Sequence, residues 1–305
     1  MEGQSSSVEQ FRAGFVALIG DPNVGKSTLL NAVLRQKISI VTPKPQTTRH
    51  KILGILSTDR MQAVFLDTPG IIEPRYALHR AMMGQSASAL DDADIIFFIV
   101  DLSRSDRQAQ CDVLAKARDP QKPVYLVLNK VDCVSPEVIA EQQSAYTAIR
   151  SFRRSFAISA LRGDGIPELL DALVVDLPMN PPYYPTDIAS DRNDRFFVAE
   201  IIREKIFLLT RDEIPYSTSV EVVEFKEREA GKWFISADIV VERASQKGIV
   251  IGKGGVLLKE IGQRARADIE RFLENPVFLD LHVKVRDKWR EKEEWVKRYG
   301  YREDR

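Results

Sequence analysis

The sequence predicts an α/β fold, a mostly parallel six-stranded sheet, followed by a smaller α+β domain. Three observations lead to it. Up to about residue 180, short apolar runs alternate with helix-patterned segments, as in a parallel sheet covered by helices on both faces. Four prolines then fall within residues 178–185, and the pattern after them changes to alternating strands and a helix–turn–helix. A chain of 305 residues is also long for one core.

The elements of the first part follow in order. Residues 48–57 predict an edge strand, antiparallel to its neighbour. The buried strands are predicted at Phe15–Gly20, Ala63–Asp67, Asp94–Asp101, Pro123–Lys130 and Phe156–Ala160. The helices are predicted at residues 27–36, 79–92, 106–118, 138–150 and 166–177.

The second part predicts a different order of elements. A helix at Phe196–Leu209 is followed by two alternating segments, typical of an antiparallel pair. Next come two helices joined by a tight turn within residues 247–274, a strand at 279–286 and a helix at 289–300. We therefore expect domains at residues 1–180 and 191–305, joined by a semi-stiff proline-rich linker at 181–190.

Bulk composition narrows the class of protein. The formal net charge is zero and neither half is basic, so any nucleic-acid contact must come from a local patch. Residues 1–10 lack the apolar run of a signal peptide, and no stretch approaches the ~20 apolar residues of a membrane span. We expect a cytoplasmic monomer. Cys111 and Cys133 are expected to be free, buried thiols.

Residues Gly20–Ser27, GDPNVGKS, fit the P-loop pattern G-x-x-x-x-G-K-[ST] between a predicted strand and a predicted helix. The glycines let backbone N–H groups turn toward phosphate oxygens, and the helix N-terminus adds its positive end. Lys26 can reach the outer phosphates, and the Ser27 hydroxyl can bind Mg²⁺. A glycine-rich turn before a helix is the ordinary alternative. The context makes a nucleotide site the better interpretation.

Residues Asp67–Gly70, DTPG, end a second buried strand. A carboxylate at that place can hold the water shell of Mg²⁺, and Gly70 can offer its N–H to the terminal phosphate and release it after hydrolysis. By itself DTPG would be an ordinary turn. After a P-loop it indicates a nucleotide-dependent switch.

Residues Asn129–Asp132, NKVD, end a third strand and distinguish guanine from adenine. The Asp132 carboxylate can accept both N1–H and the exocyclic amine of guanine, whereas adenine would leave it unpaired. Lys130 can lie along the base, and a backbone N–H of Ser159–Ala160 can meet the guanine oxygen. All of these motifs lie at carboxyl ends of strands, where open α/β sheets bind ligands. The residues expected to contact GTP are Gly20, Asp21, Pro22, Asn23, Val24, Gly25, Lys26, Ser27, Thr28, Asp67, Thr68, Pro69, Gly70, Asn129, Lys130, Asp132, Ser159 and Ala160.

The motifs GDPNVGKST, PQTTRH, DTPG, NKVD and SA, together with VIGKGG in the second half, resemble the Era family of GTPases along essentially the whole chain. The resemblance implies a P-loop GTPase domain and a KH domain of the bacterial, type II-like kind. It also implies that a switch threonine binds Mg²⁺ with Ser27 and Asp67. Thr48 is our candidate and Thr47 the alternative, since the spacing does not separate them.

The residue after DTPG is Ile71 rather than a glutamine that could orient water. Hydrolysis must therefore be organised otherwise. Asn23 resembles the asparagine of potassium-activated GTPases, in which K⁺ supplies charge between the phosphates. The alternative is that Asn23 only shapes the loop. The residues expected to act in hydrolysis are Lys26, Thr48, Gly70 and Asn23.

The turn Gly252–Gly255, GKGG, lies between two helical segments. A G-x-x-G turn lets the protein backbone come close to phosphates, and it clamps about four single-stranded nucleotides. Basic side chains around it form a local patch. The residues expected to bind RNA are Ile251, Gly252, Lys253, Gly254, Gly255, Lys247, Lys259, Arg264 and Arg266.

Two classes of function compete. The resemblance implies a GTPase that binds GTP and GDP, contacts small-subunit ribosomal RNA near its 3′ end and assists assembly or maturation of the 30S subunit. The alternative is a GTP-switched adaptor, on the inner face of the cell membrane or in the cell cycle, that uses the KH-like unit for docking. A GTPase that serves tRNA modification is a third possibility, but we find no further catalytic module for it in the sequence.

Overall fold

The computed structural model describes residues 11–70, 72–104 and 122–301. The predicted helix at 106–118, Cys111 and Ile71 lie outside these ranges. The described residues form two units with their own internal contacts. The first comprises residues up to Ile38, Ile52–Thr68 and Ser88–Asp191, and the second comprises Ser39–Lys51, Pro69–Ala87 and the chain from Arg192. This division is not linear in sequence, and the linear domain boundaries given above stay a prediction.

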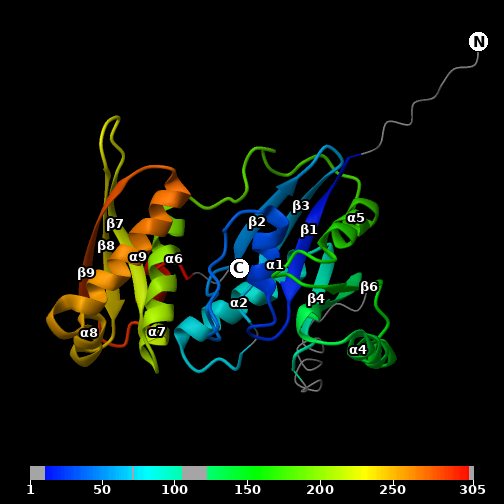
Figure 1. Ribbon diagram of the computed structural model, residues 1–305, viewed down its shortest axis with the longest axis horizontal. Coiled ribbons are helices and arrows are strands. Elements are labelled where there is room, and N and C mark those ends of the chain that lie inside the picture. The colour runs from blue at the N-terminus through cyan, green and yellow to red at the C-terminus, as the bar shows by residue number, and fades with distance from the viewer. Residues whose placement is uncertain (1–10, 71, 105–121, 302–305) are drawn as a thin grey trace, which may run out of the picture. The chain divides into compact units, whose positions relative to one another are not determined.

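The first unit contains a six-stranded sheet in the order β2-β3-β1-β4-β5-β6. Its pairs are parallel except for β2 with β3, so the predicted antiparallel edge strand is confirmed. Helix α1 packs on β2 and β3 (Figure 1). The strands are β1 (Arg12–Ile19), β2 (Ile52–Ser57), β3 (Met61–Asp67), β4 (Ile95–Asp101), β5 (Val124–Asn129) and β6 (Arg154–Ile158). The helices are α1 (Lys26–Leu34), α2 (Ala77–Asp92), which runs on from the second unit, α4 (Pro136–Ile149), α5 (Ile166–Asp176) and the 3-10 turn η1 (Val131–Cys133).

The strands of this sheet are apolar on both faces, as a sheet covered on both sides requires. Every residue of β3, β4 and β5 is buried. Gln62 is a polar exception with no exposed surface. Its amide accepts hydrogen bonds from the N–H groups of Tyr183 (2.7 Å) and Tyr184 (2.9 Å) and donates to the Tyr184 carbonyl (2.8 Å). The proline-rich linker is thereby fixed to β3.

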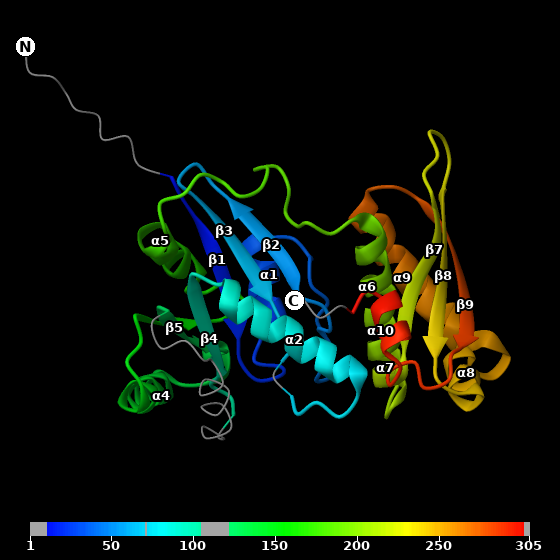
Figure 2. The ribbon, with the colours of Figure 1, turned by 180° about the vertical axis from the view of Figure 1, so that it is seen from behind.

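The second unit contains a three-stranded sheet, β7-β8-β9, in which β7 pairs antiparallel and β9 parallel to β8. Helices α6 and α9 pack side by side along it (Figures 1 and 2). The predicted order of helix, two strands, helix, glycine turn, helix and strand is confirmed. The elements are α6 (Asp194–Leu209), α7 (Ile214–Ser217), β7 (Ser219–Lys226), β8 (Trp233–Val241), α8 (Ala244–Ile251), η2 (Lys253–Gly255), α9 (Val256–Leu273), β9 (Val277–Val285) and α10 (Glu293–Arg298).

Two apolar clusters hold the second unit together. The larger lies between the sheet and helices α6, α8 and α9, and includes Ile202, Ile239 and Ile261, none of which is exposed. The smaller joins the first half of α2, through Leu78 and Met82, to β8 and to the C-terminal segment around Trp289, Val296 and Tyr301. The residues that follow DTPG in sequence therefore share a core with the C-terminal segment.

Candidate functional site

The P-loop occupies Gly20–Gly25, between β1 and α1. Gly25 immediately precedes the helix and has φ +103°. A Cβ atom added there would lie 2.3 Å from the Asn129 side-chain nitrogen, so only glycine fits. The loop therefore presents its backbone N–H groups at the start of α1 without side chains in the way, which is the arrangement that binds phosphate.

Lys26 lies beneath this loop with only 6% of its surface exposed. Its ammonium donates to the carbonyls of Gly20 (2.8 Å) and Asp21 (2.9 Å). Burial lowers the pKa of Lys26 to about 8, partly opposed by Asp67 and Asp21. A phosphate group bound in the loop would raise that pKa again, because an opposite charge favours the protonated form. The lysine is thus positioned to serve as a cation for a bound anion.

Ser27 and Asp67, the two predicted Mg²⁺ ligands of this unit, lie together. The Ser27 hydroxyl donates to the Asp67 carboxylate at 2.7 Å. Hydroxyl and carboxylate oxygens are the donors that Mg²⁺ prefers, and Mg²⁺ is ordinarily held by one or two protein groups with phosphates and water completing the shell. Within residues 11–70, 72–104 and 122–301 there is no group of three or more His, Cys, Asp or Glu side chains that could hold a metal by itself. The donor set fits a nucleotide-bound Mg²⁺.

Asn129 connects the separate loops of the predicted base site. Its amide donates to the Val24 carbonyl (2.7 Å) and accepts from the Ala160 N–H (3.0 Å). The P-loop and the Ser159–Ala160 segment are therefore fixed to each other through one buried side chain. The sequence indicates a base-contacting asparagine, and its bracing function emerges only from the three-dimensional arrangement.

Lys130 and Asp132 flank this point. The Lys130 ammonium is 2.5 Å from the Asp101 carboxylate, which holds the lysine stem in place. Asp101, a buried residue that also accepts hydrogen bonds from Ser103, is a site residue that sequence reasoning missed. A hydrogen bond from Ser159 is the main cause that lowers the pKa of Asp132, so this carboxylate is ionised at neutral pH and can accept from guanine.

Thr47, Thr48 and Gly70 belong to the second unit. The Thr47 hydroxyl donates to the Lys44 carbonyl (2.7 Å) and lies 2.6 Å from the Thr42 hydroxyl, so it closes a turn of its own segment. Thr47 and Thr48 are both 8% exposed. The choice between them as Mg²⁺ ligand, and the contact of Gly70 with phosphate, stay predictions.

The segment Ser39–Lys51 is anchored within the second unit. The Arg49 guanidinium, 2% exposed, donates to three carbonyls around α7: Pro215 (2.9 Å), Tyr216 (3.0 Å) and Thr218 (2.8 Å). The Lys44 ammonium donates to carbonyls at the end of α6. Because Arg49 follows Thr48 directly, the predicted switch threonine is held close to these anchors within the second unit.

The GKGG turn has the backbone that its glycines require. Gly252, Gly254 and Gly255 have φ values of +74°, +61° and +80°, a region that disfavours other residues. A Cβ on Gly252 would lie 2.8 Å from the Leu257 Cβ, whereas nothing lies within 4 Å of a Cβ on Gly254 or Gly255. Lys253 is exposed at the tip. The turn is open to solvent and narrow enough for close approach of a nucleic-acid backbone.

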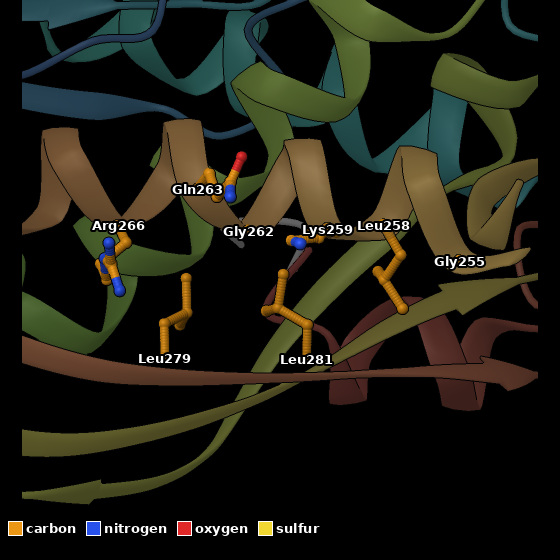
Figure 3. A pocket seen from close by; sticks show the side chains of 8 residues that line it. All are labelled: Gly255, Leu258, Lys259, Gly262, Gln263, Arg266, Leu279 and Leu281. Atoms are coloured by element: carbon orange, nitrogen blue, oxygen red, sulfur yellow. The ribbon is translucent and has the colours of Figure 1, made fainter.

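A groove of about 450 Å³ begins at this turn and runs between α9 and β9 (Figure 3). Leu279 and Leu281 point up from β9, and Lys259 and Arg266 on α9 supply charge. Of the predicted RNA residues, Gly255, Lys259 and Arg266 line it, and Arg264 instead pairs with Glu260 at 2.6 Å. Sequence reasoning missed the rest of the lining, which is Leu258, Gly262, Gln263, Leu279 and Leu281.

A glycine inside an amphipathic helix was the available signal for this groove. Gly262 lies in the middle of α9, where glycine costs roughly 0.5–1 kcal/mol relative to alanine. A Cβ there would meet only the Leu281 side chain, at 3.5 Å. The missing side chain keeps the groove open at its centre.

Two further expectations concern the whole chain. Cys133 is exposed, so its predicted burial is wrong; it lies in the η1 turn after β5, outside the sheet core. No helix in the described parts of the chain is long and apolar enough to cross a membrane.

Comparison with known proteins identifies both units. A family model described as 50S ribosome-binding GTPase matches residues 15–130, and a KH domain model matches residues 213–290. GTPase Era of Geotalea uraniireducens (strain Rf4) is 47% identical over 293 residues, covering 96% of this chain and 99% of that protein. GTPase Era of Geobacter metallireducens (strain ATCC 53774 / DSM 7210 / GS-15) is 47% identical over 292 residues, covering 95% and 98%.

Solved structures of Era proteins are similar to this chain as well. A variant of Aquifex aeolicus Era bound to GDP·AlF4⁻ is 39% identical, with a TM-score of 0.89 over 96% of this chain and 100% of that one. Era in complex with MgGDPNP and nucleotides 1506–1542 of 16S ribosomal RNA is also 39% identical, with a TM-score of 0.91 over 96% and 99%. The chain belongs to the Era family, and it is a GTPase with a P-loop domain and a KH domain.

Proposed function

We propose that this GTPase binds single-stranded RNA near the 3′ end of small-subunit ribosomal RNA and so assists assembly or maturation of the 30S subunit. The observation that carries the proposal is the groove that starts at the GKGG turn, with apolar side chains on one wall and Lys259 and Arg266 on the other. Unstacked bases need an apolar groove, and the phosphates beside them need cations and a bare backbone. A volume of about 450 Å³ suits a short run of nucleotides.

The relative whose complex contains nucleotides 1506–1542 of 16S ribosomal RNA supports the choice of RNA. The two chains are 39% identical and align over nearly their whole lengths, KH unit included. The membrane or cell-cycle adaptor has no comparable observation in its favour.

In the nucleotide site, Lys26 binds the outer phosphates and the Asp132 carboxylate recognises guanine. Ser27, Asp67 and Thr48 would hold a Mg²⁺ ion, which would neutralise phosphate charge; the MgGDPNP complex of the same relative supports that metal. Asn129 and Lys130 keep the base loops in register through Val24, Ala160 and Asp101. Gly70 contacts the terminal phosphate and releases it after hydrolysis.

The RNA site is tested by replacing Lys253 and Gly254 with Asp together. Both residues are exposed, and a side chain at Gly254 meets nothing within 4 Å, so the turn keeps its shape. Asp also tolerates the φ of +61° better than most residues. Two carboxylates would face RNA phosphates, and we expect affinity for a single-stranded RNA of the 3′ end to fall about 100-fold or more. GTP affinity should stay within a few-fold. Filter binding and nucleotide titration measure the two.

Gly262 provides a matched pair without a charge change. Gly262→Leu fills the centre of the groove and should remove most RNA binding, whereas Gly262→Ala should retain it and stabilise α9 by roughly 0.5–1 kcal/mol. Lys226→Asp, an exposed lysine on β7, controls for charge. RNA binding that survives both Gly262→Leu and the double Asp variant would place the RNA elsewhere.

A second test concerns K⁺. Asn23 is exposed and has φ +68°, which Asn adopts more readily than most residues. The cation hypothesis predicts hydrolysis about tenfold or more faster in KCl than in NaCl at equal ionic strength. Asn23→Gly keeps the backbone relaxed while removing the amide, so it should abolish the difference as fully as Asn23→Ala does. Equal rates of wild-type hydrolysis in both salts would reduce Asn23 to a loop-shaping residue.

A further inference from the structure

The second unit has another pocket, of about 250 Å³, that is distinct from the RNA groove. The start of α6, strand β7 and the C-terminal Arg298–Tyr301 segment form its walls, and His50 lines it from the segment that carries the switch threonines. The RNA groove is bounded instead by α9 and β9, so the two hollows share no lining residue.

The charge of the lining is unbalanced. Four arginines, Arg192, Arg195, Arg203 and Arg298, face two glutamates, Glu200 and Glu221. Arg203 forms a bidentate pair with Glu200, with N–O distances of 2.7 and 2.5 Å, and Arg298 lies 3.7 Å from Glu221. The lining thus carries more arginines than glutamates, which favours an anion.

Two of the arginines also contact neutral groups. Arg192 donates to the Lys51 carbonyl (3.1 Å) and stacks on the Phe196 ring, and Arg195 donates to the Phe225 carbonyl (3.5 Å) and lies over the Phe225 ring. Arg195 and Arg298 are exposed, so both can reach an incoming anion without disturbing the core.

Two buried nitrogens in the lining lack hydrogen-bond partners within the described residues: Nη1 of Arg203, whose residue is 1% exposed, and Nδ1 of His50, whose residue is 6% exposed. Unsatisfied buried donors are uncommon in native proteins. Both belong to side chains at the same pocket, and both could donate to an anion that entered it.

The His50 ring is held rigidly. It stacks on Tyr301 with centroids 4.3 Å apart and an interplanar angle of 12°, and it meets Phe196 edge-on at 5.2 Å. A neutral imidazole can hold its one proton on either ring nitrogen. An anion at Nδ1 would select the tautomer that donates from that atom.

We propose that this pocket is a second anion site, which binds the phosphate group of a small phosphorylated ligand or of an RNA chain through Arg195, Arg203, Arg298 and His50. Guanidinium groups match phosphate oxygens in pairs, which is why arginine dominates such sites. The volume holds a phosphate with an attached sugar. This pocket would bind its ligand independently of RNA binding in the groove.

Occupancy would have a consequence for the nucleotide cycle. A ligand that contacts both His50 and α6 stabilises the docked state of the Ser39–Lys51 segment by RT ln(1 + [L]/Kd). Since Thr48 lies two residues before His50, the ligand would bias the predicted switch threonine. Linkage then requires the bound nucleotide to change the affinity for the ligand by the same factor.

The full chain, loaded with Mg-GDP to fill the first site, is titrated with ribose 5-phosphate by calorimetry at low salt. We expect a Kd of about 1 mM or lower. Arg195→Ala/Arg298→Ala should weaken binding at least tenfold. Arg271→Ala, an exposed arginine on α9 that is not in the lining, should not. Only three histidines are present, so His50 ring nitrogen resonances can be assigned with a His50→Gln variant and should shift on titration while those of His79 and His282 do not.

A second experiment distinguishes RNA phosphates from a small phosphorylated ligand. A decauridylate is titrated onto the Lys253→Asp/Gly254→Asp chain, in which the groove is disabled. Binding there that is lost on adding Arg195→Ala/Arg298→Ala assigns the site to RNA phosphates, and binding of ribose 5-phosphate alone assigns it to a free ligand. Absence of both, or binding that the pocket variants leave unchanged, overturns the proposal and leaves the groove tests untouched.

Discussion

Replacing Asp132 with Asn is expected to convert this GTP-specific enzyme into one that prefers XTP. The carboxylate accepts from both N1–H and the exocyclic amine of guanine, whereas an amide presents one acceptor and one donor group. The donor opposes the guanine amine but matches the 2-oxo group of xanthine. Two charged contacts of roughly 1–3 kcal/mol each are lost, so GTP affinity should fall on the order of 100-fold or more.

Competition of GTP and XTP for a fluorescent nucleotide measures the change. Asp164→Asn is the matched control, because Asp164 is an exposed carboxylate in the turn after Ser159 and loses the same charge. A variant that still selects GTP would mean that Asp132 does not recognise the base. The lowered pKa of Asp132 also predicts how GTP affinity depends on pH. Affinity should persist as the pH falls to the usual pKa of an aspartate, and it should weaken only below that pH, where Asp132 becomes protonated.

The second large effect is expected for Arg49→Ala. Three carbonyls, those of Pro215, Tyr216 and Thr218, would lose a charged donor, and the bonds to Pro215 and Thr218 are buried. Each loss costs about 1–3 kcal/mol, which exceeds what most loop segments contribute to stability. We expect the Ser39–Lys51 segment to undock while the β7-β8-β9 sheet remains folded. Amide hydrogen exchange in residues 39–51 should accelerate about 100-fold or more, and that of β8 and β9 should change little.

Arg49→Lys should restore little of the exchange protection of residues 39–51, because one ammonium cannot replace a planar guanidinium that donates to three carbonyls. Arg271→Ala removes an exposed arginine of the same unit and should leave exchange unchanged. If residues 39–51 exchange at the wild-type rate in Arg49→Ala, the segment is held by other contacts, of which those of Lys44 and His50 are the first to test.

The fold was predictable because its signals are local. Apolar runs such as Ile95–Val100 mark buried strands, and the GKGG turn between helical stretches marks the KH order. Helix α7 was missed because four residues are too few to show a period. It matters nonetheless, since its carbonyls and their neighbours anchor Arg49.

The candidate site was predictable only where one motif contains the chemistry. Ser27 and Asp67 come from motifs, and the structure brings them to 2.7 Å. Asp101, which holds Lys130, comes from another strand with no motif of its own. Arg49 and its acceptors are separated by 166–169 residues, so no pattern in either segment reveals the pair. Contacts between distant segments are set by packing and leave little trace in a single sequence.

The shared core of α2 and the C-terminal segment determines where the chain can be cut into fragments that still fold. Cutting at the linker would leave Trp289, Val296 and Tyr301 without Leu78 and Met82, exposing an apolar surface on the C-terminal fragment. The N-terminal fragment would lose the acceptors of Arg49 as well. We therefore expect that neither fragment folds stably by itself. Recombination that exchanges one half between relatives should yield soluble chimaeras only when residues 39–51 and 69–87 travel with the KH half.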